Sequence, residues 1–281
     1  MKVLLSWSSG KDSAWTLHVL RRDGYRVAGL LTSMNETAGR VSMHGVREEI
    51  LRAQADAAGL ALVTVPLPWP CTNAIYEAQM SEAVGHAVAD GFTHIAFGDL
   101  FLEDVRRYRE DRLAGTGLTP LFPLWGTPTA RLAREMIEAG VRARISTLDP
   151  RIMPPELIGA EFDDRLLAAL PASVDPCAER GEFHTCVSGG PMFSRALDLV
   201  MGEVVEREGF VYGDLRLRTS TSVAPQRPNR ADADGAARRN EARDGGRDHE
   251  CQDGASERDR IERPDAEELR GDQAAGERRQ R

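Results

Sequence analysis

The first hundred residues alternate short apolar runs with longer segments of helical periodicity, and this alternation restricts the possible folds more than any other feature. The apolar runs have the length of buried strands, and each helical segment is followed within two residues by a glycine. The expected strands are 2–7, 26–32, 61–65 and 94–97, and the expected helices are 12–22, 46–58 and 73–90. Strands that alternate with helices predict βαβ units and a doubly wound α/β fold with a parallel sheet.

The expected sheet also predicts where a ligand binds. In doubly wound sheets, ligands bind beyond the carboxyl ends of the strands. The loops expected there are 8–11, 32–45 and 98–112. We expect these three loops to surround one crevice.

The pattern changes after about Leu118, where prolines become frequent. Helices are expected over about 128–139 and 163–170, and strands over about 141–147, 182–187 and 210–217. The sequence therefore predicts a larger α/β domain over 1–118 and a second, smaller α+β domain over 119–218.

Residues 219–281 differ in composition from the rest of the chain. They contain 13 arginines and 15 acidic residues, no aromatic residue and very few large aliphatic residues. Such a segment cannot bury enough surface to offset its ordering entropy, so we predict a disordered, charged tail. The net charge of −8 disfavours an extended nucleic-acid surface, which normally needs clustered Lys and Arg.

Cysteine use and the N-terminus bear on the compartment. The chain has four cysteines and no CxxC pair, so a disulfide framework is not expected. The apolar run 3–5 stops at Ser6, too short for a signal peptide or a membrane span. We expect a cytoplasmic protein without a membrane anchor.

The turn after the first strand carries the strongest functional signal. Ser8-Ser9-Gly10-Lys11-Asp12-Ser13 joins a strand to a helix, the arrangement in which free backbone N–H groups and the helix dipole form an anion site. It is not a Walker A loop, because Asp12 follows the lysine where Ser or Thr is required. Lys11 is one of only two lysines among 36 basic residues. An acid beside a phosphate loop suits Mg²⁺, which favours carboxylate and phosphate oxygens.

This hexapeptide resembles the SGGxDS signature of the PP-loop (N-type) ATP pyrophosphatases, with Ser9 in place of the first glycine. The resemblance implies a HUP/Rossmann-like ATP-binding domain. It also implies that ATP is cleaved to AMP and pyrophosphate, and that Mg²⁺ is held by Asp12 through the phosphates. The residues implied to bind the nucleotide phosphates are Ser8, Ser9, Gly10, Lys11, Asp12 and Ser13.

Further segments resemble the diphthine–ammonia ligase family, over roughly residues 1–215. They are Met43-His44, Gly98-Asp99, the Asp104–Asp111 segment with its arginines, and Gly181–Thr185. Ala178 stands where relatives tend to carry Gly. The resemblance assigns Thr32, His44 and Gly98 to the nucleotide side of the site. It assigns Glu179, Glu182, His184 and Thr185 to the substrate side.

The resemblance implies an AMP-forming carbon–nitrogen ligase. The acceptor is a carboxylate on a protein or a small molecule, and the second substrate is ammonia. The residues expected to be catalytic are Lys11, Asp12, Asp99, Arg107 and Arg109, the arginines because they can stabilise charge on the α-phosphate. Glu182 and His184 alternate along an expected strand, so we expect both to face the pocket and guide the nitrogen.

Two alternatives remain open from the sequence. The first is an adenine-nucleotide sensor that binds ATP on the same fold without turnover. The second is a PP-loop sulfur transferase, although the CxxC pair and the basic RNA-binding surface of such enzymes are missing.

Overall fold

The computed structural model describes residues 1–218, which belong to one compact unit. The predicted disordered tail, 219–281, lies outside the described residues. The elements are β1 (Lys2–Ser6), α1 (Lys11–Arg22), β2 (Arg26–Asn35), β3 (Arg40–Val41), α2 (Glu48–Ala58), β4 (Ala61–Leu67), α3 (Asn73–Ala89), β5 (His94–Ala96), α4 (Glu103–Leu113), β6 (Thr119–Leu121), α5 (Thr129–Glu138), β7 (Arg142–Leu148), a 3₁₀ turn (Pro155–Leu157), α6 (Asp164–Ala169), β8 (Phe183–Gly189), β9 (Leu199–Arg207) and β10 (Phe210–Leu217).

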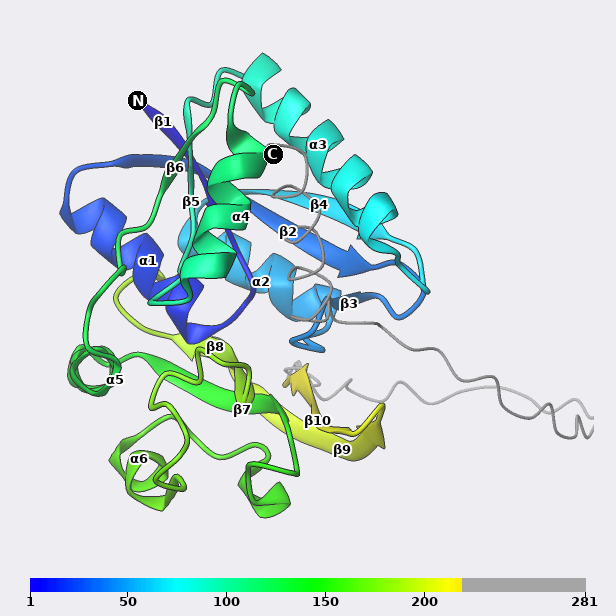
Figure 1. Ribbon diagram of the computed structural model, residues 1–281. Helices are drawn as coiled ribbons and strands as arrows, with labels where there is room; N and C mark the ends of the chain where they lie inside the picture. The colour runs from blue at the N-terminus through cyan, green and yellow to red at the C-terminus, as the bar shows by residue number, and fades with distance from the viewer. Residues whose placement is uncertain (219–281) are drawn as a thin grey trace, which may run out of the picture. The chain divides into compact units, whose positions relative to one another are not determined.

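The first sheet is parallel except for its shortest strand, as the sequence predicts (Figure 1). Its parallel strands lie in the order β4-β2-β1-β5-β6, and β3 pairs antiparallel with the end of β2. The chain therefore moves outward from β1 in one direction and then resumes at β5 on the other side. The boundary between β1 and β5 is the switch point, where ligands bind in such sheets.

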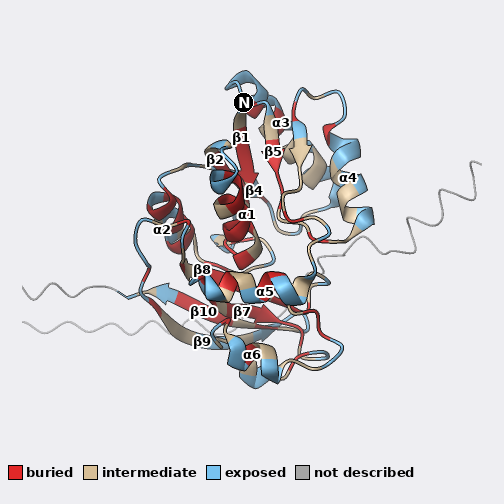
Figure 2. Cartoon of the chain, turned by 90° about the vertical axis from the view of Figure 1, so that its left-hand side faces the viewer, coloured by how far each residue is buried: buried red, intermediate tan, exposed pale blue. Residues whose placement is uncertain are grey.

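Helices cover both faces of this sheet. On β1, Val3 and Leu5 join one apolar cluster that includes residues of α1 and α2. Leu4 points to the opposite face and joins a second cluster that includes Val84 of α3 and Leu113 of α4. This alternation along a buried strand confirms the doubly wound α/β arrangement. Figure 2 shows β1 and much of α1 in the colour of buried residues.

The second sheet is antiparallel, in the order β8-β7-β10-β9. Ile145 of β7 and Val187 of β8 belong to the same apolar cluster as Leu17 of α1, so this sheet shares its core with the α1 side of the first sheet. Helix α5 adds Leu132 and Met136 to that core. The smaller α+β region is thus present as expected, and the division at 118/119 stays a prediction.

Several elements differ from the sequence-based expectation. The expected loop 98–112 is mostly helix, because α4 occupies Glu103–Leu113. Only Leu113 of that helix is buried, so its sequence shows no apolar stripe. Strands β3, β6 and β9 were not predicted. Among the described residues, no helix combines the length and apolar character needed to cross a bilayer.

Candidate functional site

The candidate site lies at the switch point between β1 and β5. The loop after β1 leads into α1, and Gly98-Asp99 follows β5. A Cβ added at Gly98 would lie 3.1 Å from the Asp12 carbonyl carbon and 3.2 Å from the Ser13 nitrogen. The two loops are therefore in close contact, and this contact requires a residue without a side chain at position 98.

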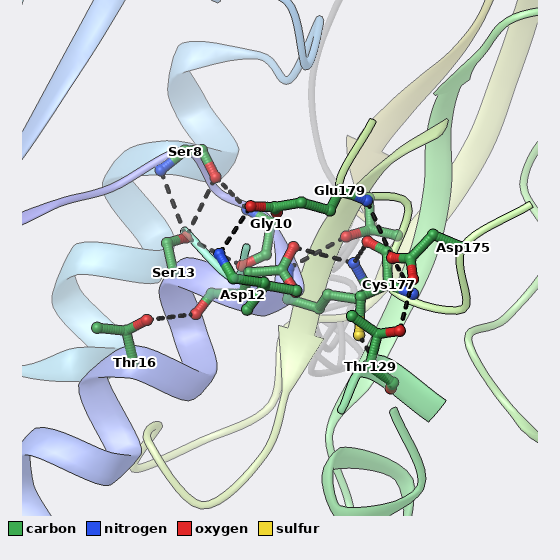
Figure 3. Close-up of polar contacts among 12 residues, drawn as sticks. Ser8, Gly10, Asp12, Ser13, Thr16, Thr129, Asp175, Cys177 and Glu179 are labelled. Atoms are coloured by element: carbon green, nitrogen blue, oxygen red, sulfur yellow. Dashed lines mark hydrogen bonds and ion pairs between the residues drawn. The ribbon is translucent and has the colours of Figure 1, made fainter. Parts of the chain in front are cut away.

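The phosphate loop, Ser8–Ser13, starts α1 without a side-chain cap. Gly10 is the N-cap residue and makes no side-chain cap hydrogen bond. The hydroxyls of Ser8 and Ser13 lie 3.3 Å apart, and the Ser8 hydroxyl accepts from the Gly10 N–H at 3.4 Å (Figure 3). The start of α1 therefore combines two hydroxyl groups with the positive end of a helix dipole, as an anion site requires.

Ser9 has a left-handed backbone with a φ of 69°. This is the position at which the PP-loop signature usually carries glycine, and the conformation explains that preference. The Ser9 hydroxyl is buried without a hydrogen-bond partner. The side chain thus contributes strain and an unsatisfied group, while its backbone carbonyl is used by the second sheet.

Strand β8 holds the phosphate loop from the other side. The Val187 N–H donates to the Ser9 carbonyl at 2.9 Å, and the Lys11 N–H donates to the Thr185 hydroxyl at 3.1 Å. The buried Gln54 of α2 donates to the carbonyls of Val187 and Ser9 at 2.7 and 3.3 Å. The loop is therefore fixed by both sheets at once.

A cavity of about 240 Å³ opens beside the phosphate loop. It brings together most of the residues predicted for the site, namely Ser8, Lys11, Asp12, Ser13, His44, Gly98, Asp99, Arg109, Glu179, His184 and Thr185. A second cavity of about 80 Å³ shares Ser6, Ser8 and Arg109 with it and extends toward Leu31 and Ser33 of β2. Together the two cavities follow the carboxyl ends of β1, β2 and β5.

The Lys11 and Asp12 side chains form an ion pair at the base of the larger cavity. Lys11 Nζ lies 2.9 Å from Asp12 Oδ2, and the lysine side chain is 2% exposed. Burial disfavours the charged form of Lys11, but the charge and hydrogen bond of Asp12, together with the charges of Cys177 and Asp175, outweigh burial, so the pKa of Lys11 is raised. Burial likewise raises the pKa of Asp12 despite the adjacent ammonium group. Asp12 Oδ1 is buried and has no protein hydrogen-bond partner.

Asp99 and Arg109 form a two-point ion pair in the wall of the cavity. Arg109 Nε lies 2.6 Å from Asp99 Oδ2, and Nη2 donates to Oδ1 at 3.1 Å. The Arg109 guanidinium also stacks over the Phe97 ring, with its centre 4.3 Å from the ring centroid. Arg107, predicted beside it, is exposed and does not line the cavity. On helix α4 the two arginines are two positions apart, so they face different directions.

The 175–181 turn supplies Glu179 to the cavity. The Asp175 carboxylate accepts from the N–H groups of Cys177 and Glu179 at 3.0 and 3.1 Å, and from the Thr129 hydroxyl at 2.5 Å (Figure 3). Glu179 in turn accepts from the Leu100 N–H at 2.7 Å, next to Asp99. Burial, reinforced by the charges of nearby carboxylates, raises the pKa of Glu179 to about 7.

Glu182 does not face the cavity as expected. Strand β8 begins one residue later, at Phe183, and Glu182 is buried at 3% exposure. Its carboxylate accepts from the Asp175 N–H at 3.1 Å. The strand alternation assumed for Glu182 and His184 therefore does not apply, and only His184 lines the cavity.

Two histidines form part of the cavity wall. The rings of His44 and His184 lie 4.5 Å apart with an interplanar angle of 37°. Burial lowers the pKa of His44 to about 4, although its contact with the Thr185 carbonyl opposes this shift. His44 is therefore neutral near pH 7. It also packs over the loop, since a Cβ added at Gly10 would lie 2.8 Å from the His44 ring.

Three residues predicted to bind the nucleotide do not line the cavity, namely Ser9, Gly10 and Thr32. Thr32 is buried, and its hydroxyl donates to the Trp7 carbonyl at 2.7 Å. It thereby fixes the strand end from which the phosphate loop starts.

Asp175, Thr129 and Gln54 hold the site in place but were not predicted as site residues from the sequence. The Asp175 carboxylate accepts a hydrogen bond from the N–H of Cys177, two residues further along the chain, a local pattern typical of Asx turns. Gln54 lies among the buried Leu51, Ala55 and Ala58 of α2. A lone amide on the apolar face of a helix is a signal that a backbone partner is nearby.

One solved structure that resembles the chain is the crystal structure of a predicted subunit of tRNA methyltransferase from Methanocaldococcus jannaschii. It shares 16% sequence identity and has a TM-score of 0.39, and the match covers 68% of this chain and 98% of that chain. A search of curated proteins found no match.

Two family models match successive parts of the chain. The diphthamide synthase N-terminal domain matches residues 1–113, which contain the phosphate loop and Asp99. The diphthamide synthase C-terminal domain matches residues 128–218, which contain the 175–181 turn and β8. The two matches occur in chain order and span nearly all of the described residues, so the chain belongs to the diphthamide synthase family.

Proposed function

We propose that the protein is an ATP-dependent ligase that forms an amide from an acceptor carboxylate and ammonia. The observation that carries this proposal is the phosphate loop at the start of α1, whose Asp12 lines the cavity and has one buried carboxylate oxygen without a protein partner. Backbone N–H groups, hydroxyls and a carboxylate are the groups that a magnesium-bound triphosphate needs.

The proposed reaction has two steps. An oxygen of the acceptor carboxylate attacks the α-phosphorus of ATP, the bond to the β-phosphate breaks, and pyrophosphate leaves. Ammonia then attacks the activated carbonyl carbon, the bond to AMP breaks, and the nitrogen loses a proton. Mg²⁺, held by Asp12 through the phosphates, would neutralise charge on the leaving pyrophosphate.

The chain's own residues have distinct proposed roles. Ser8 and Ser13 bind the phosphates. Arg109 stabilises charge on the α-phosphate, and Asp99 orients the Arg109 side chain. The smaller cavity beside β2 receives the nucleoside. Glu179 and His184 guide the nitrogen, because they line the cavity where Glu182 does not. Arg107 takes no part in this scheme.

The acceptor is proposed from chemistry and family together. The step requires a free carboxylate, on a protein or on a small molecule. The name of the family points to diphthine, the carboxylate precursor of diphthamide on elongation factor 2. A host without diphthamide needs another carboxylate in that role.

Labelled ATP tests the reaction class. With ATP labelled at the α-phosphate, Mg²⁺, ammonium chloride and a competent carboxylate, the protein should release labelled AMP together with pyrophosphate. Release of ADP as the direct product would contradict the proposal. Binding of ATP without any turnover, with every carboxylate tried, would favour a nucleotide sensor instead.

The nitrogen donor can be tested in the same assay. Glutamine-dependent enzymes need a cysteine nucleophile. Among the cysteines of residues 1–218, Cys71 lines neither cavity, and burial raises the pKa of both Cys177 and Cys186, the latter to about 12. We therefore expect ammonium chloride to support AMP release and ammonia-free glutamine to give none. Equal rates with the two donors would contradict the use of free ammonia.

A further inference from the structure

The ammonium group of Lys11 lies beneath the 175–181 turn. Lys11 Nζ donates to the Cys177 carbonyl at 2.5 Å and to Asp12 Oδ2 at 2.9 Å. The side chain is 2% exposed although the cavity beside it is open. Two of the three ammonium hydrogens therefore have protein acceptors, one of them on the opposite side of the site from the phosphate loop.

Aromatic rings complete the surroundings of this ammonium group. Lys11 Nζ lies 5.4 Å from the centroid of the Phe162 ring and 5.6 Å from that of Phe183. Both rings are almost completely buried. Cation–π attraction to two rings stabilises the ammonium in this position and opposes its movement into the open cavity.

The turn held by Lys11 is the one that carries Glu179 into the cavity. Asp175 binds its N–H groups from within, and the Lys11 ammonium binds its Cys177 carbonyl from the phosphate loop. Ala178, next in the chain, has a φ of 57°, a conformation that an L-residue adopts only when its neighbours hold it. The lysine contact is one of those constraints.

We propose that Lys11 is a positioning residue that holds the 175–181 turn, and with it Glu179, against the phosphate loop. The phosphates are bound by the N–H groups of the loop and by the Ser8 and Ser13 hydroxyls. This assignment rests on the proposed function in one respect, namely that phosphates occupy the loop. It replaces the expectation that the lysine contacts the phosphates directly.

The choice of lysine in an arginine-rich chain agrees with this role. Lys2 and Lys11 are the only lysines among 36 basic residues, so the chain uses arginine wherever a surface charge suffices. A compact ammonium with rotatable donors fits between two phenyl rings and a carbonyl. A planar guanidinium with five donors would leave several of them unsatisfied there.

The first test combines binding, turnover and proteolysis in Lys11→Met, with Lys2→Met as the matched control. We expect the Kd of Mg²⁺-ATP and of pyrophosphate to stay within about threefold of wild type, while AMP release falls at least about tenfold, the split typical of a lost positioning contact. Trypsin should cut after the exposed Arg180 at least about tenfold faster, because the turn opens more often. Lys2→Met should match wild type in all three.

An opposite pattern overturns the proposal. Loss of pyrophosphate affinity by more than about tenfold in Lys11→Met, with cleavage after Arg180 as slow as in wild type, would make Lys11 a phosphate ligand. Binding and proteolysis do not require turnover, so they remain informative if the wild-type protein releases no AMP. In that case the proposed function fails and the role of Lys11 is still decided.

A second measurement needs no variant. Acetylation of the wild-type protein with an amine-reactive ester, read by peptide mass spectrometry, should modify Lys2 and leave Lys11 unmodified equally with and without Mg²⁺-ATP. Ready acetylation of Lys11 that Mg²⁺-ATP suppresses would contradict the proposal, because it would show an ammonium group that is free until the nucleotide arrives.

Discussion

The phosphate loop and the 175–181 turn face the same cavity but are held in different ways. The phosphate loop continues directly from a buried strand into a helix, and its Ser9 carbonyl is bound by the backbone of β8. The 175–181 turn belongs to no helix or strand and is held by the Asp175 carboxylate and the Lys11 ammonium. One half of the site therefore depends on main-chain geometry, and the other half depends on a few buried charges.

This difference predicts which functions each region controls. Substitutions of Ser8, Asp12 and Ser13, the phosphate-loop residues proposed to hold the phosphates and their magnesium, should change nucleotide affinity. Substitutions that loosen the turn should leave nucleotide affinity intact and lower only the later chemistry.

Asp12→Asn should have the largest effect. It removes the charge proposed to hold the magnesium-bound phosphates, so AMP release should fall by about 100-fold or more and Mg²⁺-ATP should bind more weakly. It also leaves the buried Lys11 ammonium without its ion-pair partner, so the free energy of unfolding should fall by about 3 kcal/mol. Isothermal titration, an AMP assay and urea unfolding measure the three quantities.

The control for this variant is Asp23→Asn at the other end of the same helix. Asp23 pairs with Arg22 in an exposed ion pair, so its loss should change little. Unchanged Mg²⁺-ATP affinity in Asp12→Asn would break the division between the two regions, because a phosphate-loop residue would then be dispensable for binding.

Asp175→Asn tests the turn. An amide cannot accept all three hydrogen bonds that the Asp175 carboxylate accepts, so the free energy of unfolding should fall by about 1–3 kcal/mol. AMP release should fall about tenfold through misplacement of Glu179, while Mg²⁺-ATP affinity stays within about threefold. The exposed Asp164 supplies the control, as Asp164→Asn. An equal loss of ATP affinity in Asp175→Asn would show that the two regions are not separable.

Ser9→Gly and Ala178→Gly compare the two regions directly. Both residues have positive φ, 69° at Ser9 and 57° at Ala178. Each substitution should stabilise the protein by about 1 kcal/mol in urea unfolding, because glycine adopts this conformation without strain. Ser9→Gly should gain more, since it also removes a buried hydroxyl that has no partner.

The control for the glycine pair is Ala133→Gly within α5. Ala133 is buried in regular helix, so glycine there should destabilise by about 1 kcal/mol or more. A destabilised Ser9→Gly would indicate that the serine hydroxyl has a function in the loop that outweighs the strain of its backbone.

The smallest expected effect is on the pH dependence of stability. The pKa of Glu179 is raised to about 7 from its ordinary value of 4.5, so between these values the folded protein binds more protons than the unfolded chain. Stability should therefore fall as pH rises through this window and then level off. Glu179→Gln should flatten that fall in urea unfolding without Mg²⁺ or nucleotide. An unchanged slope would contradict the shift.

The parallel sheet could be predicted from the sequence because its strands and helices each carry a clear apolar period. Strand β1 and helix α1 bury almost every apolar residue they have. Helix α4 was not predicted because only one of its residues is buried. Strand β9 was not predicted because much of it is exposed. Periodicity reports burial, so elements that bury little leave little signal.

The phosphate loop could be predicted for a similar reason, since its function depends on consecutive residues. The turn could not, because its contacts join residues far apart in the chain, such as Thr129 with Asp175 and Lys11 with Cys177. Glu182 was misplaced because the start of β8 at Phe183 removes it from the strand alternation. Contacts of that kind become visible only once the two sheets are side by side.

The hydrogen bond from Val187 to the Ser9 carbonyl has a consequence for the order of events during synthesis. The phosphate loop is made well before the strand that completes it, which emerges from the ribosome some 180 residues later. Contacts of such sequence separation form late, after local helices and hairpins. A nascent chain that ends before β8 therefore has the signature of a nucleotide site without its second wall. A nucleotide that needs both walls could therefore assist folding only after β8 has been synthesised.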